Sequence, residues 1–448
     1  MDPVLQCRVR LPPPSVPWIR IVALFASLPV IAALLFRTYS WGVAPRWFEV
    51  VRQLDLLYGA VELGVIAVAR NYGFSYADVY HRLPRDARCA LIIFLSTFWI
   101  SSVVGSDMVA YSIARAALWP LHLLFGAALW YLGGRSDAGA VRWLLRTLLL
   151  GYAAYAPILA WHFLAAPAPS AVPGGEIIWT SALPGYLSVR HFGIEMGAML
   201  AMAMGTLWRD PRALGRPWIG FATIALVGGA ACWSGTRAAV FGAGGALILT
   251  VTVRRCPPRA SAAALIAVAL LVGGALAQTL VPPSDSFGFR LAPSDVASAG
   301  FSSGRVELWR AALRLFLQRP LTGWGEGSSL WLIVSDGVSF AHPHDIAVQM
   351  LESWGAPAAL AAFYLVARLW LELRRRGEAH GWLLPLLMAT DALLIMSFVD
   401  GVYFHARLLM LVGVLHAIGL AATAAPIRES SLRERRRSPG GDIAVSLS

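Results

Sequence analysis

Runs of about twenty predominantly apolar residues recur along this 448-residue chain, and each is long enough to cross a bilayer as a helix. Hydrophobic residues make up 58% of the chain and charged residues 14%, whereas soluble domains are nearer half apolar and about a quarter charged. The pattern predicts an all-α, polytopic integral membrane protein and excludes the disordered, collagenous and disulfide-stapled classes. About twelve spans are expected, near residues 19–36, 53–69, 89–104, 116–133, 143–164, 192–208, 217–232, 238–253, 261–281, 346–367, 382–399 and 404–424.

The distribution of arginine predicts the topology. The sequence contains no lysine, so all 37 basic residues are arginines. With the N-terminus in the cytoplasm, every inside segment carries at least three of them, which is the positive-inside pattern. Both termini are therefore expected in the cytoplasm, with no signal peptide at the N-terminus. The net charge of +12 is accordingly assigned to orientation and to membrane lipids, and not to nucleic acid.

The longest outside loop covers residues 282–345. Its segment Val306–Gln318 places apolar residues on one side and arginines elsewhere, which predicts an amphipathic helix at the outer membrane–water boundary. The four cysteines have no metal-ligand spacing, and with three of them cytoplasmic no disulfide is expected. No internal repeat is evident, which does not favour an inverted-repeat transporter.

Three outside clusters carry residues suited to chemistry. Arg237 is the sole charge in a very short outside turn; it is either an interfacial anchor or a ligand-binding group. Arg305 opens the amphipathic helix behind Ser302 and Ser303; this is either an N-cap or an anion site. His342-Pro343-His344-Asp345 precedes the tenth span.

Arginine binds phosphate through two parallel charge-assisted bonds, and a neutral imidazole can act as a general base near pH 7. Two arginines and a histidine at a membrane surface therefore suit a lipid-linked phosphate or pyrophosphate donor. Two histidines without cysteine or carboxylate partners are too few for zinc, so no metal and no cofactor is expected.

Other polar residues carry weaker indications. Arg190 and His191 end an outside loop with Glu195 one turn deeper, which suggests either a functional group or an Arg190–Glu195 structural pair. Asp400-Gly401 is expected to serve a turn. Three further carboxylates are interpreted as packing or pairing groups: Asp55, Glu62 and Asp391.

Three segments resemble the O-antigen ligase and polymerase superfamily of bacterial inner-membrane glycan transferases. Residues 234–238 read SGTRA, 303–309 read SGRVELW and continue to PLTGWG at 320–325, and 341–345 read AHPHD, followed by Glu352 and Gly355. His344 and Gly355 fit the ligase spacing of the family, while Asp345 and Ala358 depart from the residue types it uses.

The resemblance implies metal-independent transfer of a glycan from undecaprenyl pyrophosphate to an acceptor hydroxyl on the periplasmic side. Arg237 and Arg305 would hold the pyrophosphate and His344 would be the base, with His342, Arg190 and Asp345 as secondary candidates. The acceptor could be a glycan, lipid A–core or a protein hydroxyl, so a ligase, an O-antigen or exopolysaccharide polymerase and a protein O-oligosaccharyltransferase all stay open.

The expected organisation is N-terminal transmembrane helices (1–219), a ligase-like catalytic region (220–400), the last transmembrane helix (401–427) and a cytoplasmic arginine-rich tail (428–448). Two other classes of function remain. A small-anion transporter would place ionisable groups near the midplane of broken helices. A non-catalytic assembly component would leave His344 dispensable.

Overall fold

A computed structural model of the chain describes residues 19–23, 54–136, 138–165, 183, 186, 188–208, 210–279, 305–335, 338–377 and 380–423. Most of the predicted span 19–36, the loop residues 282–304 and the tail 428–448 lie outside these residues. A helix lies at every other predicted span.

The helices described between residues 54 and 165 are α3 (Leu54–Asn71), α4 (Tyr76–Arg82), α5 (Arg85–Ile100) with its π-helical extension η1 (Ser101–Gly105), α6 (Val109–Ala116), α7 (Leu118–Gly133) and α8 (Ala138–Ala165). The next group is α10 (Val189–Leu207), α11 (Pro217–Trp233), α12 (Arg237–Ile248) with η3 (Leu249–Val253), and α13 (Ala260–Thr279). Ser75 caps α4 by accepting from the Asp78 amide, and Pro217 opens α11 with its fixed φ.

The remaining elements are α15 (Arg305–Gln318), α16 (Ser329–Leu332), a short antiparallel pair β1 (Val334–Ser335) and β2 (Val338–Ser339), α17 (Ile346–Gly377), η4 (Gly381–Leu383), α18 (Leu384–Ser397) and α19 (Ala406–Thr423). Six helical segments of the described chain have the length and apolar composition to cross a membrane: 85–105, 109–133, 139–161, 260–279, 346–377 and 406–423. Three shorter apolar helices lie at 217–233, 237–253 and 381–397.

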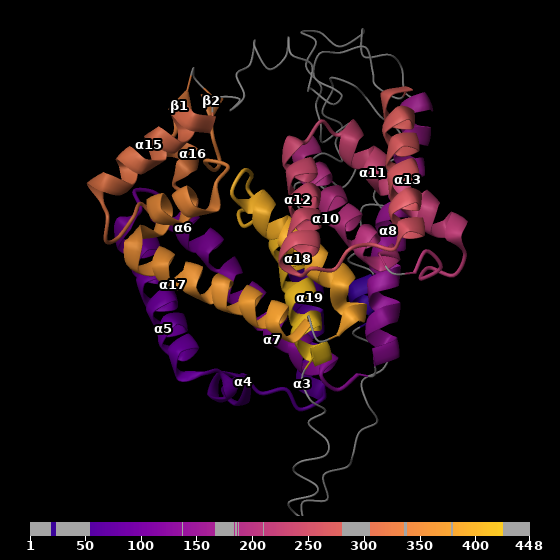
Figure 1. Ribbon diagram of the computed structural model, residues 1–448. Helices are drawn as coiled ribbons and strands as arrows, with labels where there is room; N and C mark the ends of the chain where they lie inside the picture. The colour runs from indigo at the N-terminus through magenta and orange to yellow at the C-terminus, as the bar shows by residue number, and fades with distance from the viewer. Residues whose placement is uncertain are drawn as a thin grey trace, which may run out of the picture.

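Helix α10 is the centre of one half of the bundle and packs against α11, α12 and α18 (Figure 1). Its close approach to α12 depends on glycine: a Cβ on Gly193 would lie 2.1 Å from Thr236 Oγ1, and one on Gly197 would lie 2.8 Å from Ala239 Cα. Such small residues let helix backbones approach closely in membranes, where packing drives association. The same contact brings the first turns of α10 and α12 to the same end of the bundle.

The other half contains α5, α15 and α17 (Figure 1). Helix α17 is broken at Gly355, whose φ is +74° and whose ψ is 169°. The break frees backbone carbonyls, and the PLTGWG segment uses them: the amide of Trp324 donates to Glu352 O (3.1 Å) and that of Gly325 to Ser353 O (2.8 Å). These bonds satisfy buried backbone groups and anchor the C-terminal end of α15.

The amphipathic helix predicted at Val306–Gln318 is confirmed as α15, and part of its apolar surface is directed at the protein. Leu308 and Ala312 are buried against Ile333, with Leu315 and Val348 packed around them. The protein itself therefore covers part of the apolar surface of α15, while Leu313 and Leu317 stay exposed. The position of this helix at the outer membrane boundary stays a prediction.

Candidate active site

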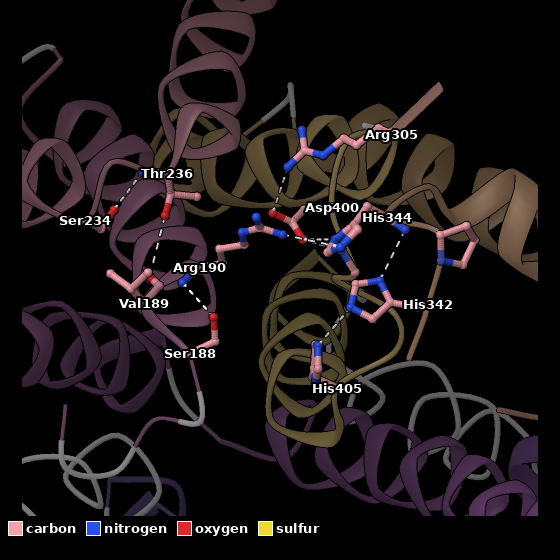
Figure 2. A network of polar contacts seen from close by, with 12 residues as sticks. Ser188, Val189, Arg190, Ser234, Thr236, Arg305, His342, His344, Asp400 and His405 are labelled. Atoms are coloured by element: carbon pink, nitrogen blue, oxygen red, sulfur yellow. Dashed lines mark hydrogen bonds and ion pairs between the residues drawn. The ribbon is translucent and has the colours of Figure 1, made fainter. Parts of the chain in front are cut away.

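Five helix termini converge at one end of the bundle and carry the candidate residues (Figure 2). Arg190 is in the first turn of α10, Arg237 opens α12, and Arg305 opens α15. His344 precedes α17, and Asp400 lies in the turn between α18 and α19. Residues up to 210 positions apart in the sequence thus share one site, because each stands where its helix begins or ends.

His344 lies between a carboxylate and a guanidinium. Its Nδ1 is 3.0 Å from Asp400 Oδ1, and its Nε2 is 3.3 Å from Arg190 Nη1. Arginine only donates hydrogen bonds, so Nε2 must be the accepting nitrogen. The ring is therefore neutral, with its proton on Nδ1 donated to Asp400. This tautomer leaves the lone pair of Nε2 on the side of the arginines.

Asp400 is buried and accepts from several donors. Its Oδ1 also accepts from the amide of Gly401 (2.8 Å), and its Oδ2 is 3.6 Å from Arg305 Nη2. Burial raises the pKa of Asp400, but the hydrogen bond from His344 and the positive charges of Arg190 and Arg305 outweigh it and hold that pKa below its usual range. Asp400 is therefore an anion that balances the arginines around it.

The three arginines share one electrostatic environment. Burial lowers the pKa of Arg305, and the positive charges of Arg190 and Arg237 lower it further, against the opposing effect of Asp400. Arg190 is exposed, and its helix starts at the N-cap Ser188, whose hydroxyl accepts from the Arg190 amide (3.2 Å). A cluster of guanidinium groups with a single carboxylate is suited to bind a multiply charged anion.

The structure gives Asp345 a structural role. Its Oδ1 accepts from the amide of Val348 (2.9 Å), three residues into the chain of α17. This is an N-cap contact, and aspartate and asparagine serve it about equally well. Asp345 therefore departs from the residue types of the ligase pattern without loss of the cap.

One expectation about buried acids is corrected and another is confirmed. Glu195 does not pair with Arg190: its carboxylate binds the buried Arg407 of α19, with Arg407 Nη2 donating to Oε2 at 2.7 Å. Tyr58 and Tyr186 complete this network as partners of Arg407 (2.7 and 3.0 Å). Asp391 pairs with Arg254 (2.7 Å) and Glu62 with His122 (2.6 Å), as expected of pairing groups.

His342, His344 and Asp400 together offer one ligand atom each within 4.8 Å of one another. The expectation of no zinc site rests on two histidines without a carboxylate partner, and the fold brings the carboxylate of Asp400 close to both. Other features oppose a cation: Arg190 and Arg305 lie beside two of the donors, and His342 Nδ1 already accepts from the His344 amide (3.2 Å).

Several residues of the site were missed as functional groups. The sequence predicts a turn role for Asp400, because the rule that makes a positive charge such as Arg237 unusual in a predicted outside turn does not apply to a carboxylate. The Nε2 atoms of His405 and His342 lie 3.3 Å apart, and the ring of His405 packs at a tilt of 50° against that of His191, with 3.6 Å between centroids. A histidine at the start of an apolar helix carries no signal that distinguishes it from an interfacial residue.

Known proteins resemble the part of the chain that carries this site. Residues 221–363 match the sequence profile of a family described as O-antigen ligase. The chain is also 30% identical over 173 residues to an O-antigen ligase of Pseudomonas aeruginosa. Both comparisons show that part of this chain is similar to O-antigen ligases.

The match to the Pseudomonas protein covers 38% of this chain and 39% of that relative, so the two are comparable over about two fifths of their length. Arg237, Arg305 and His344 lie inside the residues that the O-antigen ligase profile covers, whereas Arg190 and Asp400 lie outside them. The similarity to O-antigen ligases and the apolar helices together support a multi-pass bacterial membrane protein.

Proposed function

We propose that this protein transfers a glycan from undecaprenyl pyrophosphate to an acceptor hydroxyl, as an O-antigen ligase-like enzyme of lipopolysaccharide or exopolysaccharide biosynthesis. One observation carries the proposal: His344 Nδ1 lies 3.0 Å from Asp400 Oδ1, and His344 Nε2 lies 3.3 Å from Arg190 Nη1. A base next to a cationic site is what attack on a sugar with a pyrophosphate leaving group requires.

The reaction follows from these positions. His344 Nε2 takes the proton of the acceptor hydroxyl as that oxygen bonds to the anomeric carbon. The bond between this carbon and the phosphate oxygen breaks on the opposite face, so the configuration inverts. The imidazolium that forms is stabilised by Asp400, as in other histidine–carboxylate pairs.

The three arginines would bind the pyrophosphate and the charge that develops on it. Arg305 and Arg237 remain the first candidates, and the position of Arg190 adds it as a third. In this structure Arg190 contacts His344 Nε2, the atom that would take the proton of the acceptor hydroxyl. Binding of a diphosphate draws Arg190 to the anion and so frees Nε2, which couples donor binding to activation of the base.

The geometry favours this function over its rivals. A small-anion transporter needs its charges near the midplane of broken helices, whereas these lie at the ends of five elements. A metal-dependent mechanism would place a cation beside the guanidinium groups of Arg190 and Arg305, whose positive charges repel it. The ligase, polymerase and protein transferase differ in the acceptor, and the ligase is our leading assignment because His344 and Gly355 keep the ligase spacing.

The test uses purified full-length protein in proteoliposomes with an undecaprenyl-pyrophosphate-linked glycan and lipid A–core as acceptor. His344→Ala and His344→Gln should each lower the rate by about a hundredfold to ten-thousandfold. His380→Ala, an exposed histidine beyond the far end of α17, is the matched control and should retain full activity. EDTA should leave the wild-type rate unchanged. Activity of both His344 variants would remove imidazole catalysis.

Arg305→Lys and Arg237→Lys test the pyrophosphate site, since an ammonium lacks the bidentate fork. Each should weaken donor binding by about tenfold or more, as the loss of a charge-assisted bond implies. Arg310→Lys, on the exposed side of α15, is the control. Unchanged donor binding in both site variants would exclude the arginine clamp.

We further propose that the site faces the periplasm and that both termini are cytoplasmic. Single cysteines replace Leu321, an exposed residue beside the break of α17 at Gly355, and Arg375, an exposed residue in the last turn of α17, in a background without the four native cysteines. An impermeant thiol reagent should label Leu321→Cys in intact spheroplasts and label Arg375→Cys after lysis. The reverse pattern would place the site in the cytoplasm.

A further inference from the structure

His344 has an unusual backbone conformation. Its φ is +59°, in the left-handed region, where Arg255 is the other non-glycine residue among those described. Such a conformation is strained for a side chain with a Cβ and persists only where the surroundings enforce it. The contacts of the His344 backbone therefore show what positions the proposed base.

The amide of His344 donates to Nδ1 of His342 at 3.2 Å. A nitrogen that accepts a hydrogen bond carries no proton, so His342 must carry its proton on Nε2 when neutral. The ring of His342 is buried, and burial holds its pKa well below the usual value. His342 is thus a neutral imidazole with a fixed tautomer.

The next contact transmits this constraint to His405. His342 Nε2 lies 3.3 Å from His405 Nε2. Since His342 donates there, His405 Nε2 must accept, and its proton is on Nδ1. No other neutral assignment satisfies both bonds. The two rings have opposite tautomers, and Figure 2 shows them in sequence behind His344.

The His405 end of this chain is rigid. His405 packs at a tilt against His191 and is two residues from Arg407, which is fixed by Glu195, Tyr58 and Tyr186. Gly401 leaves room for the His342 ring: a Cβ there would lie 2.2 Å from His342 Cε1. The packing therefore holds His342 in the one place from which it reaches the His344 amide.

We propose that His342 and His405 are positioning residues, which act as a pair of neutral imidazoles of opposite tautomer to hold His344 in its left-handed conformation between Asp400 and Arg190. The inference rests on the proposed function, in which His344 is the base. In this proposal His342 and His405 act only through hydrogen bonds, and their effect depends on which ring nitrogen accepts. Neither residue exchanges a proton with the substrate.

Amide side chains test this assignment atom by atom. Asparagine ends at the level of Nδ1 and glutamine at the level of Nε2, so each can replace one of the two nitrogens. His342 needs its acceptor at Nδ1, which His342→Asn retains and His342→Gln loses. His405 needs its acceptor at Nε2, which His405→Gln retains and His405→Asn loses.

The assay is glycan transfer by the full-length variants in proteoliposomes with the lipid-linked donor. His342→Asn and His405→Gln should keep kcat within about fivefold of wild type, since one weak bond is at stake. His342→Gln and His405→Asn should lose about a hundredfold in kcat with little change in KM, as displacement of a base by about 1 Å implies. In this crossed pattern asparagine is tolerated at position 342 and glutamine at position 405, but not the reverse. A role in space filling alone would not produce it.

A second measurement needs no substitution to be active. Solid-state ¹⁵N spectra of histidine-labelled wild-type protein distinguish the two neutral tautomers, and the signals are assigned by their loss in His342→Asn and His405→Gln. The proposal expects Nε2–H for His342 and Nδ1–H for His405. Equal tautomers, or equal activity of the asparagine and glutamine variants at each position, would overturn it. If His344→Ala is active, the proposed base fails; if only the crossed pattern is missing, the positioning role fails alone.

Discussion

Replacing Asp400 by asparagine tests the electrostatics of the proposed site with almost no change in shape. In the native site Oδ1 accepts from His344 Nδ1 (3.0 Å) and the Gly401 amide (2.8 Å), while Oδ2 is 3.6 Å from Arg305. An amide has one oxygen and one donor group, so it cannot satisfy all three donors.

Each orientation of the new amide has a cost. If the amide oxygen replaces Oδ1, the NH2 group faces the guanidinium of Arg305, so that two donors meet. If the amide is flipped, the NH2 group faces the N–H of Gly401, again donor to donor, and His344 must accept at Nδ1. The proton then moves to Nε2, which faces the N–H groups of Arg190 and can no longer accept a proton from substrate.

The lost charge-assisted bond is worth about 1.5–3 kcal/mol, or roughly a ten- to hundredfold loss in rate. The wrong tautomer adds to this and brings the expected loss toward the ten-thousandfold seen when a buried carboxylate behind a catalytic histidine becomes an amide. The assay is kcat for transfer from the lipid-linked donor. Asp345→Asn is the matched control and should stay near wild type, because asparagine keeps the α17 cap. Equal rates for Asp400→Asn and wild type would refute the histidine–carboxylate pair.

Three further predictions follow from the same contacts. Gly401→Ala places a Cβ 2.2 Å from the His342 ring, so it should lower the stability by about 1–3 kcal/mol and reduce transfer, measured against Gly244→Ala, whose Cβ meets nothing within 4 Å; full activity would contradict the packing. Glu195→Gln leaves the Arg407 charge buried without its counterion and should destabilise the protein by about 3–5 kcal/mol, whereas Glu372→Gln on the surface should cost about 1 kcal/mol or less; equal melting temperatures would refute this. The folded state lowers the pKa of His342, so below about pH 6.5 the unfolded chain binds a proton that the folded chain does not bind. The free energy of unfolding should then decrease by up to about 1.4 kcal/mol per pH unit. Between about pH 8 and 5 the melting temperature should fall less in His342→Asn than in the wild type, and an equal fall in both would exclude the effect.

The sequence by itself determined the local structure and the ends of the helices. Apolar periodicity and length predicted helices that the structure contains at each described span, because these patterns depend on residues within a few turns of one another. The same reasoning found Arg237, Arg305 and His344, since each stands next to an apolar run whose end could be read from the chain. It also predicted the amphipathic helix, although not which part of its apolar surface the protein covers.

Only the tertiary structure decided which of these residues meet. Arg190 and His344 are 154 residues apart, and His344 and Asp400 are 56 apart. No local pattern reports such a contact. The pairing of Glu195 with Arg407, and the accepting nitrogen of each histidine, likewise depend on which side chain the helix packing places opposite. A hydrogen bond depends on distances of a few tenths of an ångström, and these are decided by close contacts such as that of Gly193 with Thr236. The sequence therefore identifies residues that can do the chemistry, and the packing of the helices decides which of them act together.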